Sequence, residues 1–179
     1  MCMIAKGRIM TIIGIVGGNS DETANLFLRM YQEKETAPLL NSYNMTEDNG
    51  ISLVCIDENQ EILPCKNLFD KFDKVNVWLI QEVLPTWQPN ENSCLIINAD
   101  ADHVFAHRGA ISYGFNGKAS VTASSVADGA MQVCVQRGFK TLGGKVFEPQ
   151  EFKASCPPDV SPINVLGAVT ACAVCDNMF

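Results

Sequence analysis

Four nearly continuous apolar runs constrain the fold of this chain more than any other feature. They are rich in β-branched residues and occupy Thr11–Gly17, Ile51–Asp57, Val75–Ile80 and Cys94–Asn98. Such runs are typical of parallel strands buried on both faces, whereas half-exposed strands alternate apolar and polar residues. The runs therefore predict an α/β fold with a mostly parallel sheet and flanking helices, similar to P-loop proteins.

Residues 110 to 152 show a different pattern of shorter β-rich segments separated by glycine turns. Asn116-Gly117, Asp128-Gly129 and Gly143-Gly144 stand between these segments. Asn-Gly and Asp-Gly between β-rich runs are the strongest short signals for a hairpin. We therefore expect an antiparallel hairpin section in the second half of the chain.

The chain closes with the apolar segment "SPINVLGAVTACAVCDNMF". Ser161 fits the N-cap of a helix, and Pro162 fits the first helical position. Alanine, leucine and valine fill the positions that follow, so this helix is expected to be mostly buried.

Length and composition limit the classes of protein to consider. The 179 residues suffice for one domain with a sizeable core, and we treat residues 1–179 as a single domain. A net charge of −7 argues against nucleic-acid binding, which needs clustered Lys and Arg. No apolar run reaches the roughly 18 residues that a membrane-spanning helix needs. We expect neither nucleic acid nor membrane as a partner.

The chain contains eight cysteines. Cys55, Cys94 and Cys134 lie inside apolar runs, which predicts buried thiols and a cytoplasmic location where they stay reduced. Cys172-x-x-Cys175 lacks a second pair of ligands, so packing in the closing helix is favoured over a zinc or redox role.

The first apolar run leads into a glycine turn and the start of a helix. Gly17 and Gly18 allow a tight turn, Asn19 fits the helix cap, and Glu22 has the spacing of a capping box. One apolar face then recurs at helical spacing through Ala24, Phe27, Leu28 and Tyr31.

Many proteins hold nucleotide phosphates at such a strand–turn–helix unit, because the helix start offers free N–H groups. However, the P-loop pattern G-x-x-x-x-G-K-[ST] is absent, and Asp21 and Glu22 occupy the first helical turn. Two readings stay open: a capped helix in an α/β core, and a phosphate site. The residues of that candidate site are Gly17, Gly18, Asn19, Ser20, Asp21, Glu22 and Thr23.

Four segments, in order along the chain, resemble the central ATP-binding domain of the Mur ligase family, the UDP-N-acetylmuramyl peptide ligases. "IIGIVGGNSDETA" resembles the family's phosphate loop, and "LIINADADHVF" resembles its "NADD" segment. "AISYGFNGKASVTASSVADGAMQVCVQRG" is similar to the strands that follow, and "SPINVLGAVTACAVC" to the closing helix. Residues Gln32–Ser93 match only loosely.

The resemblance implies a shortened central domain, because the chain lacks the length for the family's substrate domains. Members use ATP and Mg²⁺ to join an amino acid or peptide to a peptidoglycan precursor. Here the family's Gly-Lys-Thr-Thr stands as Ser20-Asp21-Glu22-Thr23, so the phosphate lysine is missing. In the closing helix Asn164 keeps one asparagine of the family's pattern, whereas Gly167 replaces the second.

These departures predict a degenerate P-loop with lost or weakened ATP-dependent ligase activity. The protein would then act in binding or as a partner, for example as a homo-oligomer. The alternative is an active amide ligase subunit that binds nucleotide through the turn and Asn164. Ser20 or Thr23 would then hold Mg²⁺, and a partner chain would supply the missing domains.

His103 and His107 are the only histidines and follow Asp100 and Asp102. Imidazoles and carboxylates are metal ligands, so a small metal-dependent enzyme is a further alternative. In one register of the resemblance, His103, beside Asp102, would be the Mg²⁺ ligand. The simpler interpretation is that both histidines lie in a loop and bind no metal.

Overall fold

The computed structural model describes residues 11–32, 51–56, 75–82, 89, 92–101 and 109–176. In these parts the chain forms an α/β fold built on an eight-stranded sheet with the order β10-β7-β6-β5-β4-β3-β1-β2. Strands β1 to β6 pair in parallel, and β7 runs antiparallel to β6 and β10. The prediction of a mostly parallel α/β sheet with an antiparallel section is confirmed at this level.

All four apolar runs form neighbouring strands of the parallel half. They are β1 (Thr11–Val16), β2 (Ile51–Ile56), β3 (Val77–Ile80) and β4 (Cys94–Asn98). Strand β1 lies between β2 and β3 in the sheet, so the next strand along the chain lies on one side of β1 and the strand after it lies on the other side. In parallel α/β sheets, such a reversal of strand order creates a crevice at the carboxyl ends of the strands.

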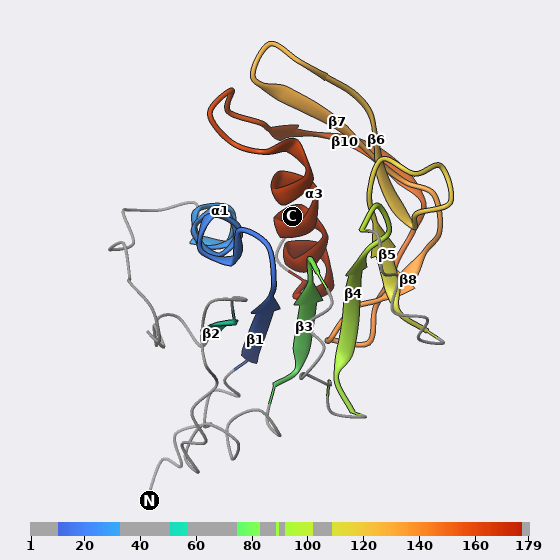
Figure 1. Cartoon of the computed structure of the whole chain (residues 1–179). Helices are drawn as coiled ribbons and strands as arrows, with labels where there is room; N and C mark the ends of the chain where they lie inside the picture. Colours follow the sequence, from blue (N-terminus) through green and yellow to red (C-terminus); the bar gives the residue numbers. More distant parts are fainter. Residues whose placement is uncertain are drawn as a thin grey trace, which may run out of the picture.

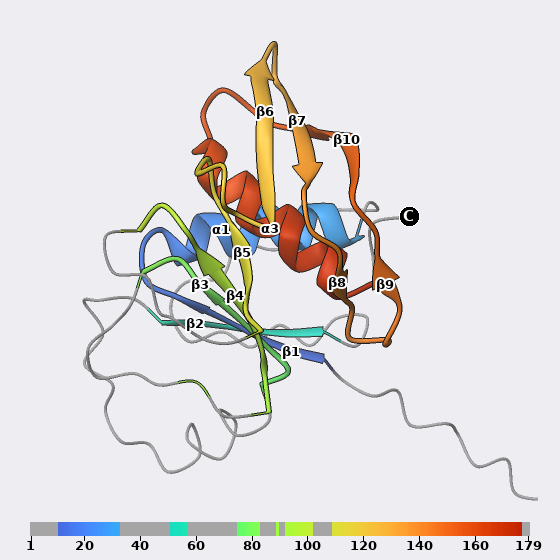
Figure 2. The ribbon, with the colours of Figure 1, turned by 90° about the vertical axis from the view of Figure 1, so that its right-hand side faces the viewer.

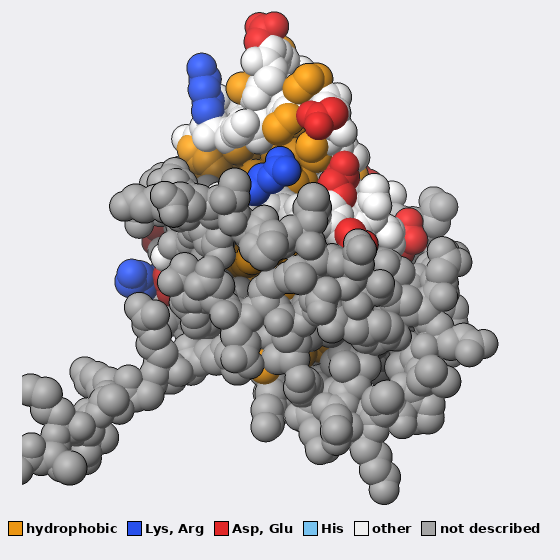
Figure 3. Space-filling view, turned by 90° about the vertical axis from the view of Figure 1, so that its left-hand side faces the viewer, with side chains coloured by type: hydrophobic (Ala, Val, Ile, Leu, Met, Phe, Trp, Pro, Cys, Tyr) orange, Lys and Arg blue, Asp and Glu red, His pale blue; other side chains and the backbone are white. Residues whose placement is uncertain are grey.

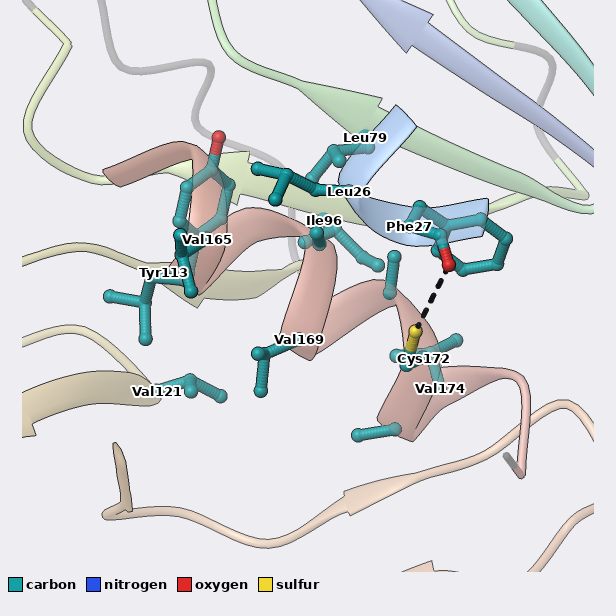
Figure 4. Packing of buried hydrophobic residues seen from close by; sticks show 14 of the residues in the cluster. Leu26, Phe27, Leu79, Ile96, Tyr113, Val121, Val165, Val169, Cys172 and Val174 are labelled. Atoms are coloured by element: carbon teal, nitrogen blue, oxygen red, sulfur yellow. Dashed lines mark hydrogen bonds between the residues drawn. The ribbon is translucent and has the colours of Figure 1, made fainter. Parts of the chain in front are cut away.

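The described helices, α1 (Ser20–Gln32) and α3 (Pro162–Val174), lie on the same side of the sheet (Figures 1 and 2). They pack against each other and against one sheet face. Figure 4 shows Phe27 of α1 beside Cys172 of α3, whose thiol contacts the Phe27 carbonyl oxygen at 4.0 Å. The expected burial of α3 is confirmed, because every residue from Asn164 to Val174 is buried.

Two apolar clusters fill the two faces of the sheet, as the alternation of side chains along a strand requires. One cluster includes Ile13, Ile15 and Leu79 together with the helices, and the other includes Ile12, Val16 and Trp78. Because residues of both clusters are buried, the unbroken apolar runs follow from coverage of both faces.

The antiparallel section comprises β6 (Val121–Ala127), β7 (Ala130–Val135), β10 (Gln150–Ser155) and a small sheet of β8 (Phe139–Lys140) and β9 (Val146–Phe147). Asp128 and Gly129 have φ values of 51° and 73°, which suit a two-residue hairpin turn. Gly143-Gly144 lies between the antiparallel β8 and β9. Both hairpin predictions are therefore confirmed.

The hairpin prediction at Asn116-Gly117 is wrong. Strand β5 (Ile111–Tyr113) pairs with β6 in parallel, through Tyr113 and Val121. The carboxylate of Asp100 accepts hydrogen bonds from the main-chain N–H groups of Phe115 and Asn116, at 2.5 and 2.9 Å. This contact from outside the segment holds the chain in a loop that restores its original direction.

Gly14 illustrates how closely the sheet is packed. A Cβ atom at this position would lie 1.9 Å from Trp78 Cζ3, and Trp78 is fully buried. The ring therefore occupies the space that any other residue at position 14 would need.

We predict that Gly14→Ala destabilises the protein by about 3 kcal/mol, because overpacking forces a buried aromatic ring to move. The free energy of unfolding in urea measures this effect. Gly117→Ala is the matched control, since a Cβ there meets nothing within 4 Å. Equal stabilities of the two variants would contradict the prediction.

Candidate functional site

The candidate site lies where β1 ends and α1 begins. Gly17 and Gly18 connect them with φ values of 75° and 57°, a left-handed conformation that favours glycine. A Cβ on Gly17 would also lie 2.7 Å from Glu82 Cβ. The turn thus retains the tight backbone expected from the sequence, next to the end of β3.

Gln81, the residue that follows β3, organises the side chains behind this turn. Its main-chain N–H donates to the Val16 carbonyl oxygen at 2.9 Å, which joins the ends of β3 and β1. Its side-chain Nε2 donates to Thr23 Oγ1 and Asn164 Oδ1, both at 2.8 Å. One amide therefore connects the starts of α1 and α3.

The amide of Asn164 extends this network toward the surface. Its Nδ2 donates a hydrogen bond to the carboxylate of Glu22. Glu22 is half-buried, whereas Thr23, Gln81 and Asn164 are buried. We refer to these four side chains as the Gln81 network. They bond to one another, which satisfies most of their polar atoms in a buried place.

One atom of the Gln81 network lacks a partner. Gln81 Oε1 is buried and accepts no hydrogen bond within the described part of the chain. It lies near Gly18, where an added Cβ would be 3.7 Å from it. A neutral amide oxygen with two free lone pairs beside the turn disfavours an anionic phosphate oxygen there.

The described charged side chains around the turn are acidic. Asp21 and Glu82 are exposed, and Glu22 is half-buried. Of the described basic side chains, Arg29 lies in the last turn of α1, and the others fall between Lys118 and Lys153. Figure 3 shows acidic and basic side chains distributed over the described part of one face of the molecule.

Several capping details differ from the prediction. Asn19 accepts the main-chain N–H of Thr23 through its carbonyl oxygen, at 3.1 Å. The predicted capping-box residue Glu22 bonds to Asn164. Ser161 is the N-cap of α3, but its side chain makes no capping hydrogen bond. Its carbonyl oxygen instead accepts from Asn164 and Val165.

The predicted phosphate-site residues are brought together only in part. Gly18, Thr23 and Asn164 adjoin Gln81, Gly17 adjoins Glu82, and Ser20 is buried. Asn19 and Asp21 are exposed. Gln81 itself was missed, although a polar residue directly after a buried parallel strand is a recognisable signal for the carboxyl edge of a sheet.

The predicted metal ligands are mostly beyond the described ranges. Asp102, His103 and His107 lie outside the described residues, and Asp100 is occupied by the main chain of residues 115 and 116. Among described residues, no three His, Cys, Asp or Glu side chains form a group that could hold a metal ion. The metal hypothesis stays a prediction.

The described cysteines are free thiols. Cys172 is buried as predicted, but Cys55, Cys94 and Cys134 are only half-buried. Burial raises the pKa of Cys172 above its usual range. Burial, followed by the nearby Cys94 and Asp176, raises the pKa of Cys175 to about 12. These shifts favour packing over thiolate chemistry at the Cys-x-x-Cys pair.

Comparison with known proteins adds no family. No protein-family model matches the chain, and no curated protein matches it in sequence. Within the described residues, no helix is both long and apolar enough to cross a membrane.

Replacing Gln81 should test the network directly. We predict that Gln81→Met lowers the free energy of unfolding by about 2 kcal/mol, because it leaves buried oxygens of Thr23 and Asn164 without their donor. Urea unfolding is the measurement. Glu82→Gln, an exposed change at the adjacent position, should have little effect, and equal losses in both variants would contradict the prediction.

The raised thiol pKa values predict a loss of stability at alkaline pH. Thiols ionise near pH 9 in the unfolded chain but only at higher pH in the folded one. The free energy of unfolding is therefore fully retained below pH 9 and falls as pH rises toward 12. Cys175→Ser should make this decline shallower by about 1.4 kcal/mol per pH unit. Urea unfolding between about pH 9.5 and about pH 11, where the unfolded chain has ionised and the folded one has not, measures it. An unchanged slope would contradict the assignment.

Proposed function

We propose that this chain is a Mur-ligase-like ATP-binding domain whose phosphate site has closed, and that it acts as a non-catalytic binding or partner protein. The Gln81 network carries the proposal. Thr23 and Asn164 are the side chains that the resemblance would direct toward Mg²⁺ and nucleotide. Both are instead bonded to Gln81, and Asn164 is also bonded to Glu22.

Electrostatics supports the same conclusion. A phosphate at the start of α1 would approach the carboxylates of Asp21 and Glu22, where the resembling family has a lysine. At an effective dielectric constant of about 20, one like-charge contact near 4 Å costs on the order of 4 kcal/mol. This is about half of the binding free energy of a micromolar ligand.

A second candidate function is an active ATP-dependent amide ligase subunit. It is favoured by the backbone of the turn, since Gly17 and Gly18 keep left-handed conformations and α1 begins immediately afterwards. A helix start of this kind binds anions through its free N–H groups. This candidate requires a second polypeptide for the substrate domains, and release of ADP in the presence of an acceptor carboxylate and an amine.

Calorimetric titration with Mg–ATP separates the two functions. The closed-site proposal predicts only very weak binding to the unmodified protein. Asp21→Lys/Glu22→Thr, which restores the family's lysine and threonine, should tighten binding by at least about tenfold, because a repulsive contact becomes an attractive one.

Asp21→Ala/Glu22→Ala is the matched control, because it removes both carboxylates without adding a cation. Its affinity should lie between those of the other two proteins. Tight Mg–ATP binding with hydrolysis by the unmodified protein would overturn the closed-site proposal and favour the ligase.

A further inference from the structure

Strand β10 ends the sheet on the side away from β2. It pairs with β7 alone among the described strands, in an antiparallel register from Gln150–Val135 to Ser155–Ala130. Figures 1 and 2 show β6, β7 and β10 extending beyond the parallel half of the sheet. Edge strands of this kind present main-chain N–H and C=O groups that can pair with another chain.

The register identifies which main-chain groups face outward. The N–H of Cys156 donates to the Gly129 carbonyl oxygen at 2.8 Å, which continues the same register by one pair. Because hydrogen-bonded and non-hydrogen-bonded pairs alternate in an antiparallel ladder, residues 154, 152 and 150 also bond toward β7. The N–H and C=O groups of Glu151, Lys153 and Ser155 therefore point to the outer edge.

One face of β10 carries apolar side chains and the other carries charged ones. Phe152 and Ala154 are partly buried and pack against the main apolar cluster. Glu151 and Lys153 are exposed. The exposed face of β10 thus carries one acid and one base, separated by a single residue.

We propose that two copies of this chain associate through β10, antiparallel about a two-fold axis at Phe152. This register places Glu151 opposite the partner's Lys153, and Lys153 opposite the partner's Glu151. Both pairs join residues whose main-chain groups face outward, so both form hydrogen-bonded pairs of the ladder. The interface is the same patch on both subunits, as a two-fold dimer requires.

The charges select this register over its neighbours. A shift of two residues keeps the pairing of outward-facing groups, but it sets Glu151 opposite the partner's Glu151, or Lys153 opposite the partner's Lys153. Like charges directly opposite each other destabilise a sheet. Proline at positions 149, 157 and 158 limits extension of the pairing at both ends.

Charged residues often protect an edge strand from association. Here Glu151 and Lys153 of one copy pair with Lys153 and Glu151 of the other across a two-fold axis. These charges therefore permit one register and disfavour the registers shifted by two residues. The short contact predicts a weak, concentration-dependent dimer. This inference is independent of the proposed function, because the Gln81 network does not involve β10.

Sedimentation velocity over about a hundredfold range of protein concentration tests the proposal. The unmodified protein should shift reversibly from monomer to dimer as concentration rises. Glu151→Lys and Lys153→Glu should each weaken dimerisation by about tenfold, because each places like charges opposite one another.

The double variant Glu151→Lys/Lys153→Glu exchanges the two charges and should restore dimerisation. Thermal unfolding followed by circular dichroism checks that all variants fold. A monomer at every concentration would overturn the proposal, and so would a dimer whose strength is unaffected by the single changes or not recovered in the double variant.

Discussion

The structure depends on the burial of α3 against the sheet and against α1. From Asn164 to Val174 this helix exposes almost no surface, which only a sequence of small and apolar residues permits. Gly167 marks a close approach of α3 to β5, because a Cβ there would lie 3.1 Å from the Tyr113 ring. Neither helix could cover its part of the sheet without the other, since they share one apolar cluster.

The position of α3 also explains why the candidate site is polar and yet closed. A buried helix must have its first N–H groups and any polar side chains satisfied. Asn164, in the first turn of α3, meets this requirement through Gln81 and Glu22. The side chains that resemble a nucleotide site therefore contribute to the packing of α3 on α1, so their presence alone is weak evidence for a ligand.

Much of the parallel half of the fold can be predicted from the sequence, because its signals are local. The apolar runs at β1, β3 and β4 and the Asp128-Gly129 turn need only neighbouring residues for their interpretation. The predictions that failed depended on residues far away in the sequence. Asn116-Gly117 forms no hairpin because Asp100, from another segment, holds its main chain. Gln81 was missed because its side-chain partners lie 58 and 83 residues away.

The hydrogen bonds that join Gln81 to Thr23 and Asn164 also limit what the turn can bind. A ligand that needed Thr23 or Asn164 would first have to separate them from Gln81, and its affinity would be reduced in proportion to the fraction of molecules in that open state. If opening cost about 2 kcal/mol for the buried hydrogen bonds, the open fraction would be a few per cent. Repulsion between a phosphate and the carboxylates of Asp21 and Glu22 weakens binding to the open state further. The main-chain N–H groups at the start of α1 can offer only a modest attraction against both effects.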